Sequence, residues 1–314
     1  MTADDRSTTD PTLDFLCVGA ATWDIIFAVD EVPRAPVKVL ANECLEVASG
    51  MATSAAIAIA TLGGSVRIRS RVGDDALGQR YKQAVDGRGV DTSLVETVAQ
   101  ARTALSTIIV GSDGERLICP YYDPALYHPP PAAVHRDANT HVLVDMRWPA
   151  QAEAVLSAGG EHYRVLDADI APREHYAGLV AGATHTLFSQ EGLRIFADTA
   201  HIGRGLRFAA ERTDGVVGVT LGAEGAVILE RQALQHYPGL SVDAVDTLAA
   251  GDVFHGAFLF QIAQTHDVAA AVRFANTAAA LKCTTFGGNL GAPTLGAVES
   301  RWRDAPSARG WRES

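Results

Sequence analysis

The sequence predicts an α/β fold with a mostly parallel central sheet that is covered by helices on both faces. Short apolar runs with strand character alternate with helical patterns along most of the chain, as in strands joined by crossover helices. No long linker or low-complexity tract divides the 314 residues, which suffice for one large domain with an appendage. Two pairs of strand-like runs interrupt the alternation and predict a small separate β-sheet.

The expected strands of the central sheet are short apolar runs bounded by polar or turn-forming residues. In chain order they are 15–20, 66–71, 141–145, 163–166, 186–188, 216–220 and 226–230. Helical patterns between several of them lie at 53–62, 77–86 and 149–158. The two inserted strand pairs are 25–47 and 104–122, and the second turns at Gly111-Ser112-Asp113-Gly114.

Composition and charge limit the possible partners. Hydrophobic residues make up 47% and charged residues 20% of the chain, which is ordinary for a globular protein. The formal net charge of −11 argues against nucleic acid or an anionic membrane as a partner. Because an acidic surface also repels phosphates, any anion site has to be built from local groups.

Cysteine usage and the ends of the chain indicate a cytoplasmic protein. The four cysteines are far apart and form no Cys-x-x-Cys pair, which disfavours a metal site or a disulfide framework. Residues 1–10 are polar and unlike a signal peptide, and the longest apolar stretch, 55–62, is too short to cross a bilayer. We expect a disordered tail at 1–12, a domain over 13–300 and a C-terminal tail at 301–314.

The most informative segment is Asp-Thr-Leu-Ala-Ala-Gly-Asp-Val-Phe at 246–254, which precedes an apolar, proline-free run. We expect a buried helix to begin at Gly251 or Asp252. Unpaired amides at a helix start bind anions, and the small side chains of Ala249, Ala250 and Gly251 let phosphate oxygens approach them. Asp252 would then accept the proton of an attacking hydroxyl. An aspartate that only caps a core helix has the same pattern.

Several other catalytic motifs are absent from the sequence. Nothing matches the Gly-x4-Gly-Lys-Ser/Thr loop of P-loop NTPases, and no Gly-x-Gly-x-x-Gly follows the first strand. The histidines form no His-Glu-x-x-His pair. His255 lies one helical turn from Asp252, and we interpret it as a helix residue packed beside the site rather than as a base.

The segment 246–254 resembles the second signature of the ribokinase (PfkB) family of sugar kinases, usually Asp-Thr-x-Gly-Ala-Gly-Asp-x-Phe. Other family features follow in order over nearly the whole chain. They are Leu16-Cys17-Val18-Gly19 with Asp24, the first signature at 50–64, Arg71-Val72-Gly73-Asp74-Asp75 with Gly78, and Val219-Thr220-Leu221-Gly222 with Gly225. The resemblance implies a ribokinase-like α/β fold with a small β-sheet lid, and ATP-dependent phosphorylation of a primary hydroxyl of a sugar.

Position 249 departs from the family pattern, which usually has glycine there. Since alanine has a Cβ atom, we expect Ala249 to adopt an ordinary right-handed or β conformation with its amide directed at the phosphate. A strained residue at this position would favour a non-catalytic sensor over a kinase.

The resemblance also assigns residues to the sugar. Asp24 would accept hydrogen bonds from sugar hydroxyls, and Gly50 would let the sugar approach the backbone. The usual Gly-Gly of the first signature is Ser49-Gly50 here, and the usual asparagine is Ser54. Both departures argue against the specificity of a ribokinase.

Within the family, the sequence is most similar to the sulfofructose (6-deoxy-6-sulfofructose) kinases. The shared segments are 52–56, 144–148, 166–172, 251–257, 272–275 and 279–284. In that branch a lid lysine and an arginine near the end of a central strand hold the sulfonate, and Lys38 and Arg147 stand at the matching positions. The lid asparagine of that branch is replaced by Pro120. The alternative is that neither residue binds the substrate. Arg147 would then form a structural ion pair, and Lys38 would be solvated.

For the nucleotide, the resemblance implies ATP bound beside Thr220, with Gly222 and Gly225 bordering the phosphates and the purine against Asn276 and Ala280. It also implies Mg2+ as a cofactor and leaves a requirement for K+ open.

The metal motif of the family, Asn-x-x-Glu, is missing, since the matching segment is Ser189-Gln190-Glu191-Gly192. We expect Mg2+ to be held through water and the phosphates, with Glu191 as a contributor. Family members often pair through their lids, which implies a homodimer.

Three alternatives stay open, and the first is a ketohexokinase-like kinase of the same family. A nucleoside kinase of the same family would need aromatic stacking residues in the lid, for which Tyr121 and Tyr122 are the candidates. A non-catalytic sugar or nucleotide sensor would explain Ala249, Ser54 and Gly192, whereas the retained Asp252 speaks against it.

Overall fold

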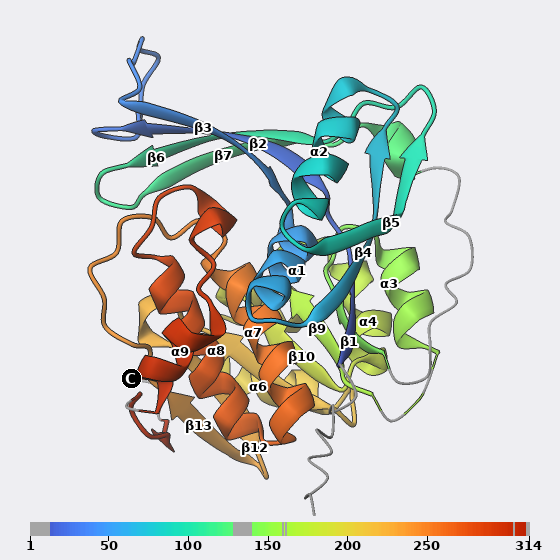
Figure 1. Ribbon diagram of the computed structural model, residues 1–314. Helices are drawn as coiled ribbons and strands as arrows, with labels where there is room; N and C mark the ends of the chain where they lie inside the picture. Colours follow the sequence, from blue (N-terminus) through green and yellow to red (C-terminus); the bar gives the residue numbers. More distant parts are fainter. Residues whose placement is uncertain (1–12, 128–139, 159, 161, 304, 312–314) are drawn as a thin grey trace, which may run out of the picture.

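The computed structural model describes residues 13–127, 140–158, 160, 162–303 and 305–311 (Figure 1). The tail expected at 1–12 therefore lies outside the described residues. The described chain forms a large α/β body with a small sheet above it, which confirms the predicted fold class.

The central sheet contains ten strands within the described residues, in the order β14-β13-β12-β11-β10-β9-β8-β1-β4-β5. Neighbours from β5 to β11 are parallel, and β12, β13 and β14 continue the sheet antiparallel. The bounds are β1 Asp14–Val18, β4 Ser65–Gly73, β5 Val90–Val98, β8 His141–Val144, β9 Arg164–Ala168, β10 His185–Phe188, β11 Val216–Thr220, β12 Ala226–Glu230, β13 Ala233–Tyr237 and β14 Arg309–Gly310.

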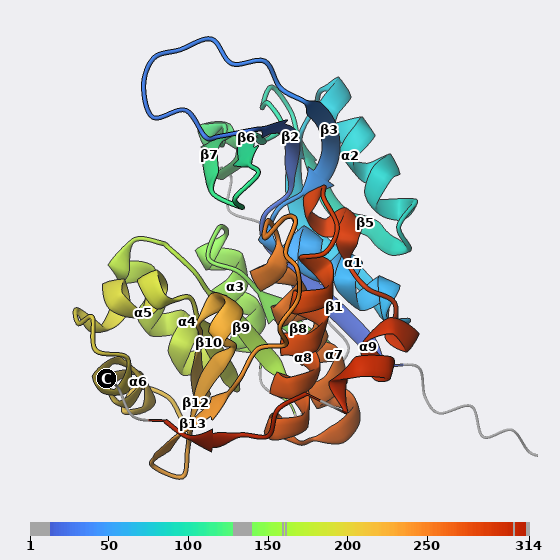
Figure 2. The ribbon, with the colours of Figure 1, turned by 90° about the vertical axis from the view of Figure 1, so that its left-hand side faces the viewer.

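Helices cover both faces of this sheet, as Figure 2 shows. One face holds α1 Met51–Thr61, α2 Ala76–Asp86, α7 Ala250–Thr265, α8 Val268–Lys282 and, outside α8, α9 Leu295–Trp302. The other holds α3 Pro149–Leu156, α4 Tyr176–Gly182, α5 Gln190–Ala197 and α6 Ile202–Ala210. Short 3-10 helices occupy Pro124–Tyr127, Arg173–His175, Gly222–Glu224 and Gly288–Gly291. No described helix is long and apolar enough to span a bilayer.

Side chains in the sequence determine where several helices begin. Asp75, Ser189, Asp267 and Thr294 each accept a hydrogen bond from a backbone amide in the first turn of α2, α5, α8 and α9. The other described α-helices, α1, α3, α4, α6 and α7, begin without a side-chain cap. Of these, α1 and α7 begin beside the candidate site.

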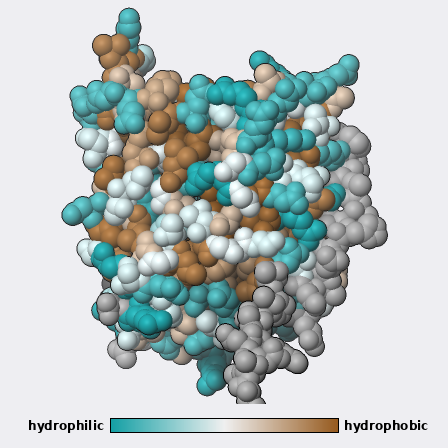
Figure 3. All heavy atoms as spheres, in the orientation of Figure 1, coloured by the Kyte–Doolittle hydropathy of each residue, from teal (hydrophilic) through white to brown (hydrophobic). Residues whose placement is uncertain are grey.

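The second sheet is the lid, with strand order β3-β2-β6-β7. Its strands are β2 Thr22–Val29, β3 Glu43–Ser49, β6 Leu105–Gly111 and β7 Arg116–Tyr121, and β2 pairs with β6 in parallel. The lid therefore coincides closely with the strand pairs predicted at 25–47 and 104–122. Some apolar side chains of the lid and of its β2–β3 loop stay exposed, and Figure 3 shows apolar surface on the protruding loop at the upper left. The exposed residues are Val37, Val39 and Leu40 in the loop and Leu117, Ile118 and Tyr121 in β7.

The chain beyond residue 300 is not a separate tail. Helix α9 continues to Trp302, and β14 pairs with β13 through His236 and Arg309. The ordered domain thus extends past the boundary that the sequence predicted, because the edge of β13 still has backbone groups to pair.

Helices α1 and α7 pack in close backbone contact. A Cβ atom added at Gly256 of α7 would lie 2.5 Å from the carbonyl oxygen of Ala55 in α1. Glycine at this position brings the two helix starts together, and with them the two backbone segments that line the site.

We predict that Gly256→Ala lowers the free energy of unfolding by about 1–3 kcal/mol, because the added methyl group separates α1 from α7. Urea denaturation of both proteins measures this change. Gly296→Ala is the matched control, since nothing lies within 4 Å of its added Cβ atom in α9, and it should raise the stability by about 0.5–1 kcal/mol. Equal effects of the two substitutions would contradict the packing argument.

Candidate active site

The candidate site lies where the parallel strands end and the lid begins. Asp145 follows β8, Asp167 and Asp169 stand at the end of β9, and Asp252 lies in the first turn of α7. Asp24 joins them from β2 of the lid. Open α/β sheets bind ligands at this carboxyl edge. The charges of Asp167, Asp169, Asp145 and Asp24 all raise the pKa of Asp252, so these four carboxylates lie near it.

The start of α7 is a sharp turn. The Ala250 amide donates to the carbonyl of Thr247 at 3.3 Å, and the Val253 amide donates to the carbonyl of Ala249 at 3.0 Å. Among the described residues, the amides of Gly251 and Asp252 make no hydrogen bond. These amides lie at the positive end of the helix dipole and are available to an anion.

The prediction for Ala249 was wrong. Its φ of 62° and ψ of 11° place it in the left-handed region. The turn requires this conformation, since a left-handed residue followed by a right-handed one makes successive amides converge on one point, as in anion-binding nests. An alanine there costs roughly 1–2 kcal/mol, and such strain is common at functional sites.

Asp252 is half-buried beside these amides, and its pKa is well above the ordinary value. Burial is the largest cause, and repulsion from Asp167 and Asp169 adds to it. Burial also raises the pKa of Asp167. A carboxylate with a raised pKa close to unpaired amides suits proton transfer beside a phosphoryl group.

Asp24 lies buried on β2, between β3 and β6. The Thr22 hydroxyl donates to its carboxylate at 2.9 Å. Burial raises its pKa, and hydrogen bonds from Ser49, Thr22 and Ser106 oppose that shift. These hydroxyls keep a buried carboxylate at the inner face of the lid, where the sequence predicted a sugar ligand.

Asp145 is fully buried and binds three backbone amides. One carboxylate oxygen accepts from Ala20 at 2.7 Å and from Ala52 at 3.0 Å, and the other accepts from Arg147 at 2.8 Å. A Cβ atom at Gly19 would lie 2.1 Å from this carboxylate. Asp145 thus fixes the turn before the lid, the start of α1 and the segment that bears Arg147.

Gly50 precedes α1 with a φ of 112°. An added Cβ atom would lie 2.3 Å from the carbonyl oxygen of Ala20. Glycine is therefore required both by the backbone conformation and by the close approach of the two segments. The resemblance-based role of Gly50 toward a sugar stays a prediction.

Arg147 is half-buried between the lid and the loop after β9. Its guanidinium donates to the carbonyl of Ile170 at 3.2 Å and lies 5.9 Å from the centre of the Tyr122 ring. Burial lowers its pKa, but Tyr122, Asp145 and Asp169 reverse that shift and raise it. Among the described residues its guanidinium has Ile170 and Tyr122 as hydrogen-bond partners, which leaves some of its five donors open to a ligand.

Lys38 lies exposed in the loop between β2 and β3. Among the described residues, no hydrogen bond or ion pair of the Lys38 side chain is found, so its ammonium faces solvent. Its role toward an anion on the sugar stays a prediction.

The residues predicted at the nucleotide lie on the other side of the α7 start. Thr220 ends β11, while Gly222 and Gly225 shape the following turn with φ of 59° and 94°. The side-chain amide of Asn276 in α8 donates to the carbonyl of Tyr237 at 2.9 Å and so fixes the loop after β13. Ala280 is half-buried one turn further along α8. Their contacts with ATP stay predictions.

Glu191, predicted to contribute to Mg2+ binding, lies in the first turn of α5, and its metal role stays a prediction. Its carboxylate pairs with the Arg194 guanidinium one turn along α5, at 2.7 Å, and this pair lowers its pKa. The described residues contain no group of three histidine, cysteine, aspartate or glutamate side chains that could hold a metal ion. A divalent ion would therefore need ligands from the nucleotide as well as from the protein.

His255 is packed beneath the site. Its Nδ1 lies 2.8 Å from the carbonyl of Gly251 and 3.4 Å from a carboxylate oxygen of Asp167, and its Nε2 lies 3.2 Å from the carbonyl of Leu187. Burial lowers its pKa. These contacts give His255 a role in joining α7 to the central sheet rather than in accepting a proton from a substrate.

Sequence reasoning gave no role to Asp145, Asp167 or Asp169. One signal was available: each carboxylate stands at or just after the end of a predicted strand, where parallel sheets present their ligands. Their mutual distances depend on the strand order β9-β8-β1, which the sequence pattern alone does not give.

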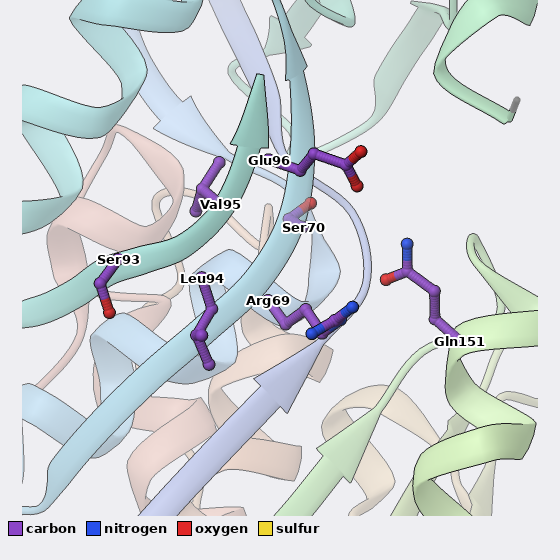
Figure 4. A pocket seen from close by; sticks show the side chains of 7 residues that line it. All are labelled: Arg69, Ser70, Ser93, Leu94, Val95, Glu96 and Gln151. Carbon is purple, nitrogen blue, oxygen red and sulfur yellow. The ribbon is translucent and has the colours of Figure 1, made fainter. Parts of the chain in front are cut away.

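A cavity of about 210 Å³ lies apart from this constellation (Figure 4). Its lining comes from β4, β5 and α3, and includes Arg69, Glu96 and Gln151. None of the residues predicted for sugar, nucleotide or metal lines it.

Comparisons with known proteins match this arrangement. The model of the pfkB family carbohydrate kinases matches residues 13–295. The ribokinase of Bacillus subtilis is 27% identical over 90% of this chain and 98% of its own, and the ATP-dependent ribose-1-phosphate kinase of Halopiger xanaduensis is 28% identical over 90% and 96%.

Among solved structures, a putative ribokinase from Agrobacterium tumefaciens superposes with a TM-score of 0.88. It is 40% identical, over 93% of this chain and 98% of its own. The family match spans nearly all of the described residues, from the first strand to the start of α9. The chain therefore belongs to the pfkB family of carbohydrate kinases.

Proposed function

We propose that this kinase transfers the γ-phosphoryl group of ATP to a primary hydroxyl of an anionic ketose, with 6-deoxy-6-sulfofructose as the leading candidate. The observation that supports the transfer is the start of α7, where unpaired amides adjoin a carboxylate of raised pKa. The Halopiger relative is named as ATP-dependent, and its sugar substrate is itself a phosphate ester, hence an anion.

In the proposed mechanism the sugar lies between Asp24 of the lid and Gly50. Asp252 accepts the proton of the attacking hydroxyl, while the amides of Gly251 and Asp252 stabilise the charge on the transferred phosphoryl group. Thr220, Gly222 and Gly225 border the nucleotide. Closure of the lid over the sugar excludes water from the reaction.

Magnesium enters this scheme with the nucleotide, and two residues fit it. Asp167 and Asp169 stand together at the end of β9, and the charge of Asp169 acts on the Asp167 carboxyl group by raising its pKa. Asp167 and Asp169 would hold Mg2+, directly or through water, since this ion keeps several waters beside one or two carboxylates. The bound ion supplies charge neutralisation for the phosphates.

The substrate class depends on Arg147. Its guanidinium lies between the Ile170 carbonyl and the Tyr122 ring, and its planar fork of donors suits a sulfonate or phosphate. The nucleoside alternative finds less support, because Tyr122 packs edge-on against Trp148, with ring centres 6.4 Å apart, and is close to Arg147.

We predict that Asp252→Asn reduces kcat by 10²–10⁴-fold, roughly the contribution of a positioned base. Nucleotide affinity should change by only a few-fold, because the amides that bind phosphate remain. Steady-state kinetics and calorimetric titration with ADP measure the two quantities. Turnover close to that of the parent enzyme would exclude Asp252 as the base.

The raised pKa of Asp252 sets the acid limb of the pH profile. Only the carboxylate form can accept a proton, so kcat/KM of the free enzyme should fall as the pH drops through this raised pKa. The limb should lie above the ordinary aspartate range. Asp167→Asn removes a like charge, lowers the pKa of Asp252 and should move the limb to lower pH. An unmoved limb would show that another group controls it.

We predict that Arg147→Ala lowers kcat/KM for sulfofructose and fructose 6-phosphate by about 100-fold or more, while fructose changes only a few-fold. Arg194→Ala, which removes an exposed arginine of α5, is the matched control. If fructose is already as good a substrate as either anion, or if all three slow alike, Arg147 is structural and a neutral sugar is the better assignment.

We also propose a homodimer formed through the lids, supported by the exposed apolar residues of β7 and of the loop before β3. Leu117 and Ile118 are 49% and 43% exposed, and Leu40 is 81% exposed. Light scattering should give twice the chain mass, and Leu117→Asp with Leu40→Asp should give the single-chain mass. A parent protein of single-chain mass would exclude this dimer.

A further inference from the structure

Lys282 is an ammonium group enclosed in the protein interior. It is the last residue of α8, and none of its side chain is exposed. Lys38, by contrast, is exposed, and Lys82 is half-buried on α2. A buried ammonium is retained in proteins only where specific oxygen ligands replace its lost hydration.

The ligands of this ammonium come from one residue, Asp246. The Nζ atom donates to the main-chain carbonyl oxygen of Asp246 at 2.6 Å and lies 3.2 Å from a carboxylate oxygen of the same residue. Burial lowers the pKa of Lys282, and the charge and hydrogen bond of Asp246 oppose this shift. The ammonium thus occupies a compact oxygen site with one negative charge.

The carboxylate of Asp246 also binds three backbone amides. It accepts from Leu248 at 2.8 Å, from Gly287 at 3.0 Å and from Gly288 at 2.8 Å. Gly287 and Gly288 have φ of 107° and 59°, which lets both amides turn toward one oxygen. The Asp246 amide in turn donates to the carbonyl of Cys283 at 3.1 Å.

The ammonium and carboxylate therefore join three segments: the end of α8, the turn at 287–288 and the loop 246–252. This loop contains left-handed Ala249 and the amides assigned to the phosphoryl group. Leu248, whose amide is held by the carboxylate, packs with Ile26 and Ile108 of the lid. The ammonium site lies directly behind the proposed phosphate-binding loop.

Without a cation, the Asp246 carboxylate would remain a buried negative charge, even with its three amide partners. That charge would lie near the incoming triphosphate of the nucleotide. A fixed positive charge behind the loop removes that repulsion and keeps the strained turn in place. A monovalent cation has the charge that this site needs, and Lys282 supplies it from within the chain.

We propose that Lys282 is a positioning residue whose ammonium serves as a built-in monovalent cation behind the loop 246–252, so that turnover needs no K+. This inference rests on the proposed function of that loop in phosphoryl transfer. The inference adds to the proposed function the group that holds the loop 246–252 in its conformation.

The test is steady-state kinetics of the parent and of Lys282→Met, in buffers whose cation is tetramethylammonium, with and without added K+ or NH4+. The parent should show the same kcat in all buffers. Lys282→Met should lose about 100-fold in kcat without small cations, as expected for a misplaced loop, and should recover much of it with K+ or NH4+. Lys82→Met is the matched control and should behave like the parent.

Three results would overturn the proposal: a parent enzyme that needs K+, a Lys282→Met variant as active as the parent, or a slow variant that no small cation rescues. If Lys282→Met does not fold, the double variant Lys282→Met with Asp246→Asn removes both charges while an amide oxygen can still accept hydrogen bonds. The double variant should fold and turn over slowly with or without K+, and parent-like turnover would also overturn the proposal.

A nucleotide-binding measurement separates this inference from the proposed function. ADP should raise the melting temperature of the parent equally with and without K+, and that of Lys282→Met only with K+. If the parent phosphorylates no sugar, the proposed function fails, while these melting temperatures still decide the role of Lys282.

Discussion

Two buried carboxylates hold the site together, each by binding three backbone amides. Asp145 joins the turn before the lid, the start of α1 and Arg147, and Asp246 joins the segments behind the phosphate-binding loop. Buried charges are tolerated only with such complete hydrogen bonding. Because both helices that border the site lack side-chain caps, these carboxylates replace local capping as the means of fixing the backbone.

Charge is distributed unevenly around this framework. Asp24, Asp145, Asp167 and Asp169 all act electrostatically on Asp252, and the Arg147 guanidinium interacts with Asp145 and Asp169. The surplus of negative charge favours a nucleotide that arrives with its divalent ion. It also means that an anionic sugar has to meet Arg147 while avoiding the carboxylates, which restricts its orientation in the cleft.

Much of the fold followed from the sequence, because alternating strand and helix patterns encode a parallel sheet directly. The two inserted strand pairs were also predicted, and the helix expected to begin at Gly251 or Asp252 begins at Ala250. The left-handed conformation of Ala249 was not, since it results from a turn closed by Thr247 rather than from the preference of alanine. The pairing of Glu191 with Arg194 was not predicted either, because it depends on the helical spacing of the two residues. The strands β5, β13 and β14 were also missed, and β14, with only two residues, is defined by its pairing with β13 rather than by a pattern of its own.

The backbone of Ala20 anchors the first strand of the lid to the α/β body. Its amide is held by Asp145, its carbonyl oxygen accepts from the Thr53 hydroxyl at 2.7 Å, and Gly50 approaches it closely. Ala20 is therefore fixed to the α/β body, although β2 of the lid begins only two residues later. If the lid rotates, this strand of the chain has to bend after Ala20, within the first residues of β2. Asp24 lies close to this bend. A movement of the lid tip by many ångströms would therefore displace the Asp24 carboxylate very little.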